Sequence, residues 1–259
     1  MPDILFEVKN KIATITLNRP ETRNAFSDEM LLGWAAGLRE SQARDDVNVV
    51  VLTGVGKAFC SGGDLSTMGK DETPNQFKEY LLTRVHPVAR AVSALDKPYI
   101  CAVNGAATGA GMDMTLYADI RFAAASARFA ESYVNVGLAP GDGGAFLLPR
   151  LVGLTKALEL LWTGDLFSAE EAERLGIVSK VLPDDQLMAH TYAFAERIAN
   201  GPSLAIRMTK KAVYDGLRSD LFQALESVSS HMGVLSFTHD HIEAVKAFRE
   251  KRKPEFKGR

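Results

Sequence analysis

Residues 99–124 read YICAVNGAATGAGMDMTLYADIRFAA, and the order of structure within them indicates the fold class. Tyr99–Val103 is an apolar run of strand length, and the glycine-rich loop after it leads into Gly109–Tyr117, where we expect a short buried helix. Ala118–Ala124 then returns to a strand pattern. Strand, loop, helix and strand in this order predict right-handed crossovers and a mostly parallel sheet with helices on its faces.

The same alternation occurs in the earlier part of the chain. Ile4–Val8 and Ile12–Leu17 are expected to form two short strands of a hairpin. Ser27 is placed to cap a helix, and Asn48–Thr53 is a nearly all-apolar strand of the kind covered on both faces. A further helical stretch is expected over roughly Asn75–Leu95.

The second half of the chain has a different character. Ser168 begins a capping-box pattern, and helices are expected to dominate from there to about Arg252, with a short strand near Ile177–Val181. We therefore predict an α/β core over residues 1–195 and a helical C-terminal region over residues 196–259.

The composition excludes several classes of protein. With 46% hydrophobic residues among 259 and a net charge of -2, the chain can bury a core, and it offers nucleic acid no general electrostatic attraction. No apolar run approaches the ~18–20 residues that span a bilayer, and the N-terminus lacks a signal-peptide pattern, so we expect a cytoplasmic protein without a membrane partner. Cys60 and Cys101 are expected to be reduced and buried, and no Cys/His cluster has metal-ligand spacing.

Two glycine-rich segments, GVGKAFCSGGDL at residues 54–65 and NGAATGAG at residues 104–111, each follow an apolar strand. Neither fits a phosphate-binding pattern well. Small residues at the end of a strand let a ligand approach the backbone closely. Together the two loops could direct two backbone N–H groups at one oxygen, as in an oxyanion hole, whereas either loop alone could be a tight turn.

KAFCSGGDL at residues 57–65 resembles the first signature of the crotonase (enoyl-CoA hydratase/isomerase) superfamily, and residues 103–113 with ADI at 118–120 resemble the second. The resemblance continues through VGLAPG at 136–141 to the tail at 248–256, and it covers nearly the whole chain. It implies an α/β fold with a crotonase-like ββα spiral core and a helical C-terminal trimerisation region. It also implies assembly into a homotrimer or a hexamer.

The resemblance further implies an acyl-CoA substrate whose thioester oxygen lies between the backbone N–H groups of Ser61 and Ala110. Coenzyme A is then part of the substrate, and neither another cofactor nor a metal is implied. Six CoA contacts follow by position: Arg23 and Lys57 near the phosphates, Ala58 and Leu65 around the adenine, and Phe256 and Lys257 closing over the nucleotide from a neighbouring subunit.

The superfamily varies its acid and base groups, so the reaction depends on them. The resemblance implies two glutamates, one that holds a water molecule and one that supplies a proton to the α-carbon. The first position is Asp113 here, a shorter acid. The second is Tyr133, which with an ordinary pKa near 10 is a poor base at neutral pH but can orient or donate.

Two more carboxyl groups lie close in sequence. Asp142 stands in a glycine-rich loop where other branches of the superfamily carry a catalytic aspartate. Glu131 faces the same side as Tyr133 if its segment is extended. An ion pair with Arg128 or Arg150 is the structural alternative for Glu131.

We therefore expect an acyl-CoA-processing enzyme, and within that class an enoyl-CoA hydratase, a lyase that adds water to a 2-enoyl-CoA. The alternatives in the same superfamily are an enoyl-CoA isomerase or an acyl-CoA hydrolase that uses Asp142 and Asp113. A hypothesis from another class is a non-catalytic CoA- or RNA-binding scaffold, motivated by the tyrosine at position 133. The clustered acidic residues and the low net charge argue against it.

Overall fold

The computed structural model describes residues 1–66, 68 and 73–259, and its strands form two sheets. The larger sheet has the order β1-β2-β3-β5-β7-β10, and its strands are β1 (Ile4–Lys9), β2 (Ile12–Leu17), β3 (Val49–Gly54), β5 (Tyr99–Val103), β7 (Ile120–Ala124) and β10 (Lys180–Leu182). The smaller sheet has the order β4-β6-β8-β9, and its strands are β4 (Ala58–Cys60), β6 (Ala106–Thr108), β8 (Arg128–Ala130) and β9 (Phe167–Ser168). Pairing is parallel except for β1 with β2 and β8 with β9.

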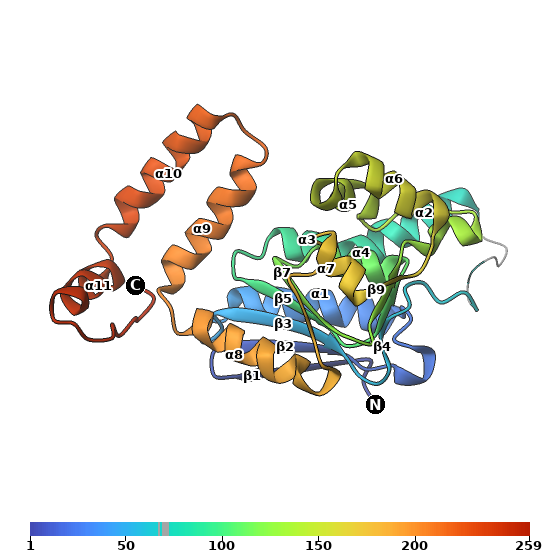
Figure 1. Cartoon of the computed structure of the whole chain (residues 1–259), viewed down its shortest axis with the longest axis horizontal. Helices are drawn as coiled ribbons and strands as arrows, with labels where there is room; N and C mark the ends of the chain where they lie inside the picture. Colours follow the sequence, from blue (N-terminus) through green and yellow to red (C-terminus); the bar gives the residue numbers. More distant parts are fainter. Residues whose placement is uncertain (67, 69–72) are drawn as a thin grey trace.

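Helices cover the sheets and form the C-terminal part of the molecule (Figure 1). The helices of the first half are η1 (Pro20–Thr22), α1 (Asp28–Ala43), α2 (Pro74–Tyr80), the π-helical turn η2 (Leu81–Val85), α3 (His86–Ser93), α4 (Ala110–Leu116) and η3 (Ser132–Val136). Those of the second half are α5 (Gly144–Val152), α6 (Leu154–Thr163), α7 (Ala169–Arg174), η4 (Asp184–Gln186), α8 (Leu187–Ala199), α9 (Ser203–Gly216), α10 (Leu221–Leu235) and α11 (His239–Arg249).

Helices α1 and α8 cover opposite faces of the larger sheet, as two adjacent residues of β2 demonstrate. Ile15 lies against Gly37 of α1, where an added Cβ would be 3.3 Å from the Ile15 Cδ1 atom. Thr14 points to the other face and its Oγ1 atom is 3.0 Å from the hydroxyl of Tyr192 on α8. Because successive side chains of a strand alternate, a sheet covered on both faces needs apolar residues throughout, and β3 and β5 are buried along almost their whole length.

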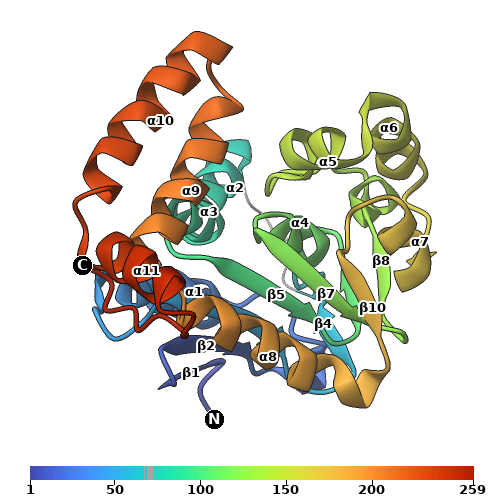
Figure 2. The same ribbon diagram turned by 60° about the vertical axis from the view of Figure 1, so that its left-hand side comes forward.

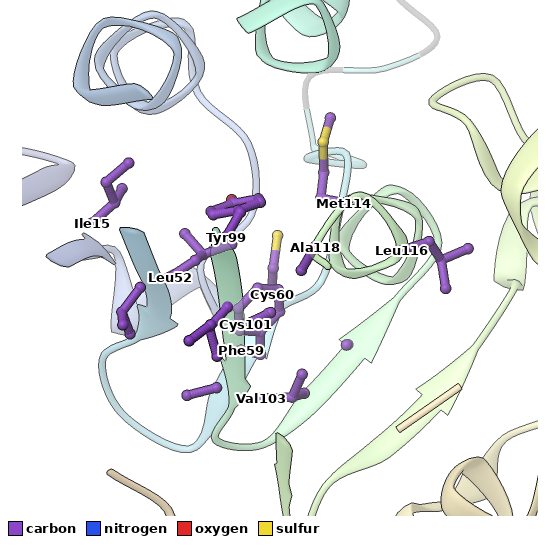
Figure 3. Packing of buried hydrophobic residues seen from close by; sticks show 14 of the residues in the cluster. Ile15, Leu52, Phe59, Cys60, Tyr99, Cys101, Val103, Met114, Leu116 and Ala118 are labelled. Atoms are coloured by element: carbon purple, nitrogen blue, oxygen red, sulfur yellow. The ribbon is translucent and has the colours of Figure 1, made fainter. Parts of the chain in front are cut away.

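The core lies between the sheets and these helices. Figure 3 shows Phe59, Cys60 and Cys101 close together in this core, with Met114 and Leu116 extending from different sides of α4. Both cysteines are free and buried, as the sequence predicts. Burial raises the pKa of the Cys60 thiol to about 12, so it behaves as a small apolar side chain.

Most of the predicted elements are present, and their differences have local causes. The helix expected over 75–95 is three consecutive pieces, since the π-helical turn η2 interrupts it before Pro87. The strand expected at 177–181 begins only at Lys180. The segment before it forms backbone hydrogen bonds to the end of α7, and the Ser179 N–H donates to the Arg121 carbonyl.

The C-terminal region projects from the core, as Figures 1 and 2 both show. The predicted boundary at residue 195 falls inside α8, whose Ala195 and Ala199 are completely buried, so the projecting part begins with α9. Large apolar side chains on this part are exposed: Val213, Leu217, Leu221, Phe222, Leu225, Met232, Val234, Phe237, Ile242 and Phe248. No helix of the described residues is long and apolar enough to span a bilayer.

Candidate active site

A cavity of about 500 Å³ opens beside the N-terminal end of α4. Its wall is mostly apolar and comes from segments far apart in sequence: Phe26, Leu65, Met68, Phe77, Tyr80, Leu81, Val85, Val136, Leu138 and Ala139. The polar residues of the lining include Ser61, Tyr133 and Asp142. An apolar cavity with a few converging polar groups is the usual form of a small-molecule site.

The two glycine-rich loops are pressed together beside this cavity. Strand β4 pairs in parallel with β6, and the Thr108 hydroxyl donates to the Ser61 carbonyl at 3.3 Å. A Cβ atom on Gly111 would lie 2.1 Å from the Cys60 carbonyl oxygen, and one on Gly105 would lie 2.2 Å from the Lys57 oxygen. Only glycine permits such close approach, so the glycines bring the ends of β4 and β6 side by side.

The structure corrects the prediction that the Ser61 N–H is a free donor. That N–H donates to the Arg23 carbonyl oxygen at 3.0 Å, because the turn after η1 runs alongside the end of β4. The Asn24 side chain holds the two segments together through the carbonyls of Ala58 and Phe59, at 2.9 and 3.0 Å. Ser61 still lines the cavity, but its backbone donor is occupied.

Two other backbone amides fit the predicted role. Gly63 and Ala110 both line the cavity, and neither N–H has an acceptor among residues 1–66, 68 and 73–259. Ala110 is the first residue of α4, so its N–H has no partner within the helix. The two loops approach closely at Gly62, because a Cβ atom on this residue would lie 2.9 Å from the Ala110 nitrogen. Ala110 therefore stays a predicted donor, and Gly63 is the candidate for the place that was predicted for Ser61.

Four acid and base candidates meet at one end of the cavity. The Tyr133 hydroxyl lies 2.8 Å from Asp113 Oδ2 and 2.9 Å from Asp142 Oδ2. The backbone N–H of Asp142 donates to the same Asp113 oxygen at 3.2 Å. Glu131 approaches Asp113 from the other side, where a Cβ on Gly144 would lie 2.1 Å from Asp113 Oδ1 and 3.1 Å from Glu131 Oε1.

These four groups are not equally accessible. Asp142 and Tyr133 line the cavity, whereas Asp113 and Glu131 do not and are 0% and 1% exposed. Asp113, predicted to hold a water molecule against the substrate, therefore lies behind Tyr133 and Asp142. Glu131 forms no ion pair with Arg128 or Arg150, whose guanidinium groups bond to backbone carbonyls near their own positions.

Burial changes the acidity of the whole cluster. It raises the pKa of Asp113 to about 6, against the opposing effect of the Gly144 N–H and the Tyr133 hydroxyl. It raises the pKa of Glu131 to about 10, and the charge of Asp113 acts in the same direction. The pKa of Asp142 is also raised by burial, and that of Tyr133 is raised far above its ordinary value. Perturbed groups of this kind beside a cavity are characteristic of active sites.

The structure places only some of the residues predicted to contact CoA at the cavity. Leu65 is 62% exposed at its rim, whereas Arg23, Lys57 and Ala58 lie outside its lining. Phe256 and Lys257 belong to the C-terminal tail, which is tied to α11 because Asp240 accepts the Lys257 N–H at 2.6 Å. Figure 1 places this tail at the far side of the molecule from α2, so within one chain it does not reach the cavity.

Part of the cavity wall was not predicted from the sequence. Phe26, Val85 and Leu138 are ordinary apolar residues in the sequence, and nothing in their pattern distinguishes wall from core. The segment from Met68 to Leu82, whose proline and polar residues favour a pocket wall over a regular core element, contributes Met68, Phe77, Tyr80 and Leu81 to the lining, and residues 69–72 lie outside the described residues. His86 was also missed; its Nε2 atom lies 3.1 Å from the Gly141 carbonyl, beside Asp142.

Comparisons with known proteins agree with this arrangement. A family model described as enoyl-CoA hydratase/isomerase matches residues 7–259. A probable enoyl-CoA hydratase of Rhodobacter capsulatus is 39% identical over 256 residues, which cover 99% of this chain and 98% of that protein. The 1,2-epoxyphenylacetyl-CoA isomerase of Escherichia coli is 36% identical over 261 residues and matches 100% of both chains.

Solved structures give the same answer. The crystal structure of an enoyl-CoA hydratase from Bacillus anthracis matches with a TM-score of 0.94 at 33% identity, covering 99% of this chain and 100% of that one. An enoyl-CoA hydratase from Mycobacterium smegmatis matches with a TM-score of 0.93 at 34% identity, covering 99% of each chain. With sequence, fold and paired glycine-rich loops in agreement, this chain belongs to the enoyl-CoA hydratase/isomerase family.

Proposed function

We propose that the protein acts on enoyl-CoA thioesters and stabilises an enolate at the thioester oxygen with the backbone N–H groups of Gly63 and Ala110. The observation that carries this proposal is that two cavity-lining amides, neither with an acceptor among the described residues, lie on adjacent loops. Backbone donors fixed in this way need no rearrangement when charge develops, and removing one such donor costs roughly 2.7–4 kcal/mol in comparable sites.

We assign to the Asp142 carboxyl group the transfer of a proton to or from the substrate. It lines the cavity, and the loop that carries it is fixed by His86 at the Gly141 carbonyl. Hydration of a 2-enoyl-CoA is the reaction expected from the sequence, and it is the activity in the printed names of several relatives. In this reaction Asp142 exchanges a proton with the attacking water or the α-carbon.

A shift of the double bond along the acyl chain is the second candidate. The Tyr133 oxygen occupies the space between the carboxyl groups of Asp113 and Asp142, where two acids could otherwise hold a water molecule. One cavity-facing carboxyl group is sufficient to remove a proton from one carbon and return it to another. An isomerase is among the relatives.

The experiment compares two substrates with the purified protein. Hydration predicts loss of the conjugated enoyl absorbance of a 2-enoyl-CoA, and a double-bond shift predicts its appearance from a 3-enoyl-CoA. The control is the A110P variant, which lacks one of the two proposed donors. If neither substrate changes and no acyl-CoA binds, the proposed function is wrong.

We also propose that the chain forms a homotrimer or hexamer through α9–α11. The exposed apolar side chains of this region, such as Phe222 and Phe237 at 80% and 87% exposure, support this proposal because such surfaces normally lie in an interface. In an assembly, Phe256 and Lys257 could contact CoA bound to a neighbouring copy. Light scattering tests the assembly, and a monomer at micromolar concentration would refute it.

A further inference from the structure

The two short contacts of Tyr133 restrict where the protons of the cluster lie. The hydroxyl oxygen is 2.8 Å from Asp113 Oδ2 and 2.9 Å from Asp142 Oδ2, both of hydrogen-bond length. A phenol carries one proton and can donate it to only one of these oxygens. The other contact therefore needs a proton from a carboxyl group, so one of the two aspartates is a carboxylic acid.

Counting donors shows which aspartate carries this proton. Asp113 Oδ2 also accepts the backbone N–H of Asp142 at 3.2 Å, so two donors point at one oxygen. Donors stabilise the charged form of a carboxyl group, which makes Asp113 the anion. Tyr133 then donates to Asp113, and Asp142 donates its own proton to Tyr133.

Glu131 lies behind this pair and cannot carry a second charge. It is 1% exposed, its carboxyl oxygens receive no donor from the described part of the chain, and its hydrogen bond with Asp113 requires that one of the two acids carries a proton. Its Oε1 and Asp113 Oδ1 both lie close to the position of a Cβ on Gly144, at 3.1 and 2.1 Å. A second unpaired charge at this depth would be very costly, so Glu131 stays neutral.

We propose that Tyr133 passes a proton between Asp142 and Asp113, so that the cavity-facing carboxyl group alternates between acid and base, and the cluster keeps one negative charge until Asp142 takes a proton from the substrate. Asp142 is the catalytic residue of this relay, and Tyr133, Asp113 and the neutral Glu131 are positioning residues that act through it. The inference rests on the proposed function, since Asp142 must meet a substrate carbon or water.

The transfer balances without solvent. Asp142 gives its proton to the Tyr133 oxygen while Tyr133 gives its hydroxyl proton to Asp113 Oδ2, so one O–H bond breaks and one forms at each end and the phenol stays neutral. Asp142, now a carboxylate, takes a proton from the substrate. The electron pair of a broken C–H bond passes into the enolate held by the Gly63 and Ala110 amides.

Two further titratable groups face the cluster. Tyr117 at the end of α4 is neutral, because burial raises its pKa to about 12. His86 at the start of α3 contacts the Gly141 carbonyl and favours the ionised form of Asp142. No lysine or arginine side chain pairs with the three acids in the described residues, so the proton is shared within the cluster.

Infrared titration of the ligand-free protein determines which carboxyl groups carry a proton when no substrate is bound. At pH 7 we expect carbonyl bands from two carboxylic acids, one of which disappears in E131Q and the other in D142N. Y214F is the matched control, because Tyr214 donates to Asp119 at 2.8 Å outside the site. Only one acid band, or bands that survive both substitutions, would overturn the assignment.

The pH profile of turnover tests the relay. The wild type should lose activity in acid near pH 6, where the shared charge is protonated. In Y133F, Asp142 must ionise beside a charged Asp113. The pH at which activity is half lost in acid should therefore rise by at least one unit, which is about a tenfold loss of activity at a fixed acidic pH. The double variant Y133F/D113N removes that charge, so the pH of half-maximal activity in acid should fall again. A purely structural role of Tyr133 does not produce this rescue.

The relay would be overturned if Y133F had the same pH of half-maximal activity in acid as the wild type, or if the double variant did not lower that pH again. If the wild type converts no enoyl-CoA, the proposed function fails, and the infrared bands still decide whether the proton is shared.

Discussion

Replacing Glu131 by glutamine should change how the stability of the protein depends on pH. The side chain keeps its size, and a glutamine amide can still donate to Asp113, the hydrogen-bond partner of the protonated glutamate. What it removes is an ionisable group. Burial raises the pKa of Glu131 from 4.5 to about 10 in the folded protein.

The magnitude follows from proton linkage. Above pH 4.5 the unfolded chain has lost this proton, and below about pH 10 the folded chain keeps it, so wild-type stability falls as pH rises through this window. One proton corresponds to about 1.36 kcal/mol per pH unit. Between pH 6 and pH 8 the free energy of unfolding of E131Q should therefore rise relative to the wild type by about 3 kcal/mol.

Urea unfolding at pH 6, 7 and 8 measures this difference, at one protein concentration because assembly contributes to stability. E7Q, which removes an exposed glutamate from β1, is the control for the loss of a surface charge. If the unfolding free energies of E131Q and the wild type remain parallel from pH 6 to pH 8, Glu131 is ionised in the folded protein. The reasoning about the buried cluster would then be refuted.

Three further substitutions test the site. D142N should reduce kcat by about 10²–10⁴-fold with little change in KM, measured by steady-state kinetics, because proton transfer is lost while binding remains. A110P removes the backbone N–H at the first position of α4, where proline is tolerated, and should reduce kcat by roughly 10²–10³-fold relative to A110G, which keeps the donor; equal rates would contradict the oxyanion hole. G144A places a Cβ 2.1 Å from Asp113 Oδ1 and should lower the free energy of unfolding by about 1–3 kcal/mol, whereas G233A in α10 has open space and should not.

The sequence was sufficient to predict the fold because its signals are local. Apolar runs such as Tyr99–Val103 are strands, the cap at Ser27 starts α1, and the glycine-rich segments follow the ends of β3 and β5, although the short strands β4 and β6 inside those segments were not predicted. These signals come from residues that are adjacent in the sequence, so they can be recognised without a structure. Trp162 illustrates the limit, since its apolar surroundings in the sequence are typical of a core residue but its side chain is 71% exposed on α6.

The site was predicted less well, because its chemistry depends on directions and on contacts between distant segments. Nothing in SGG at residues 61–63 shows which amide turns into the cavity, and the Arg23 carbonyl that occupies the Ser61 N–H is 38 positions earlier in the sequence. Likewise, Asp113, Tyr133 and Asp142 were each candidates, but a single phenol between two carboxyl groups becomes visible only when η3 and α4 are packed together.

The most direct test of the account is a crystal structure with an unreactive acyl-CoA analogue. The account predicts that the thioester oxygen lies about 2.7–3.1 Å from the backbone nitrogens of both Gly63 and Ala110, with Asp142 facing the acyl carbons. A thioester oxygen that contacts only solvent, or one that displaces the Arg23 carbonyl to reach the Ser61 N–H, would contradict it.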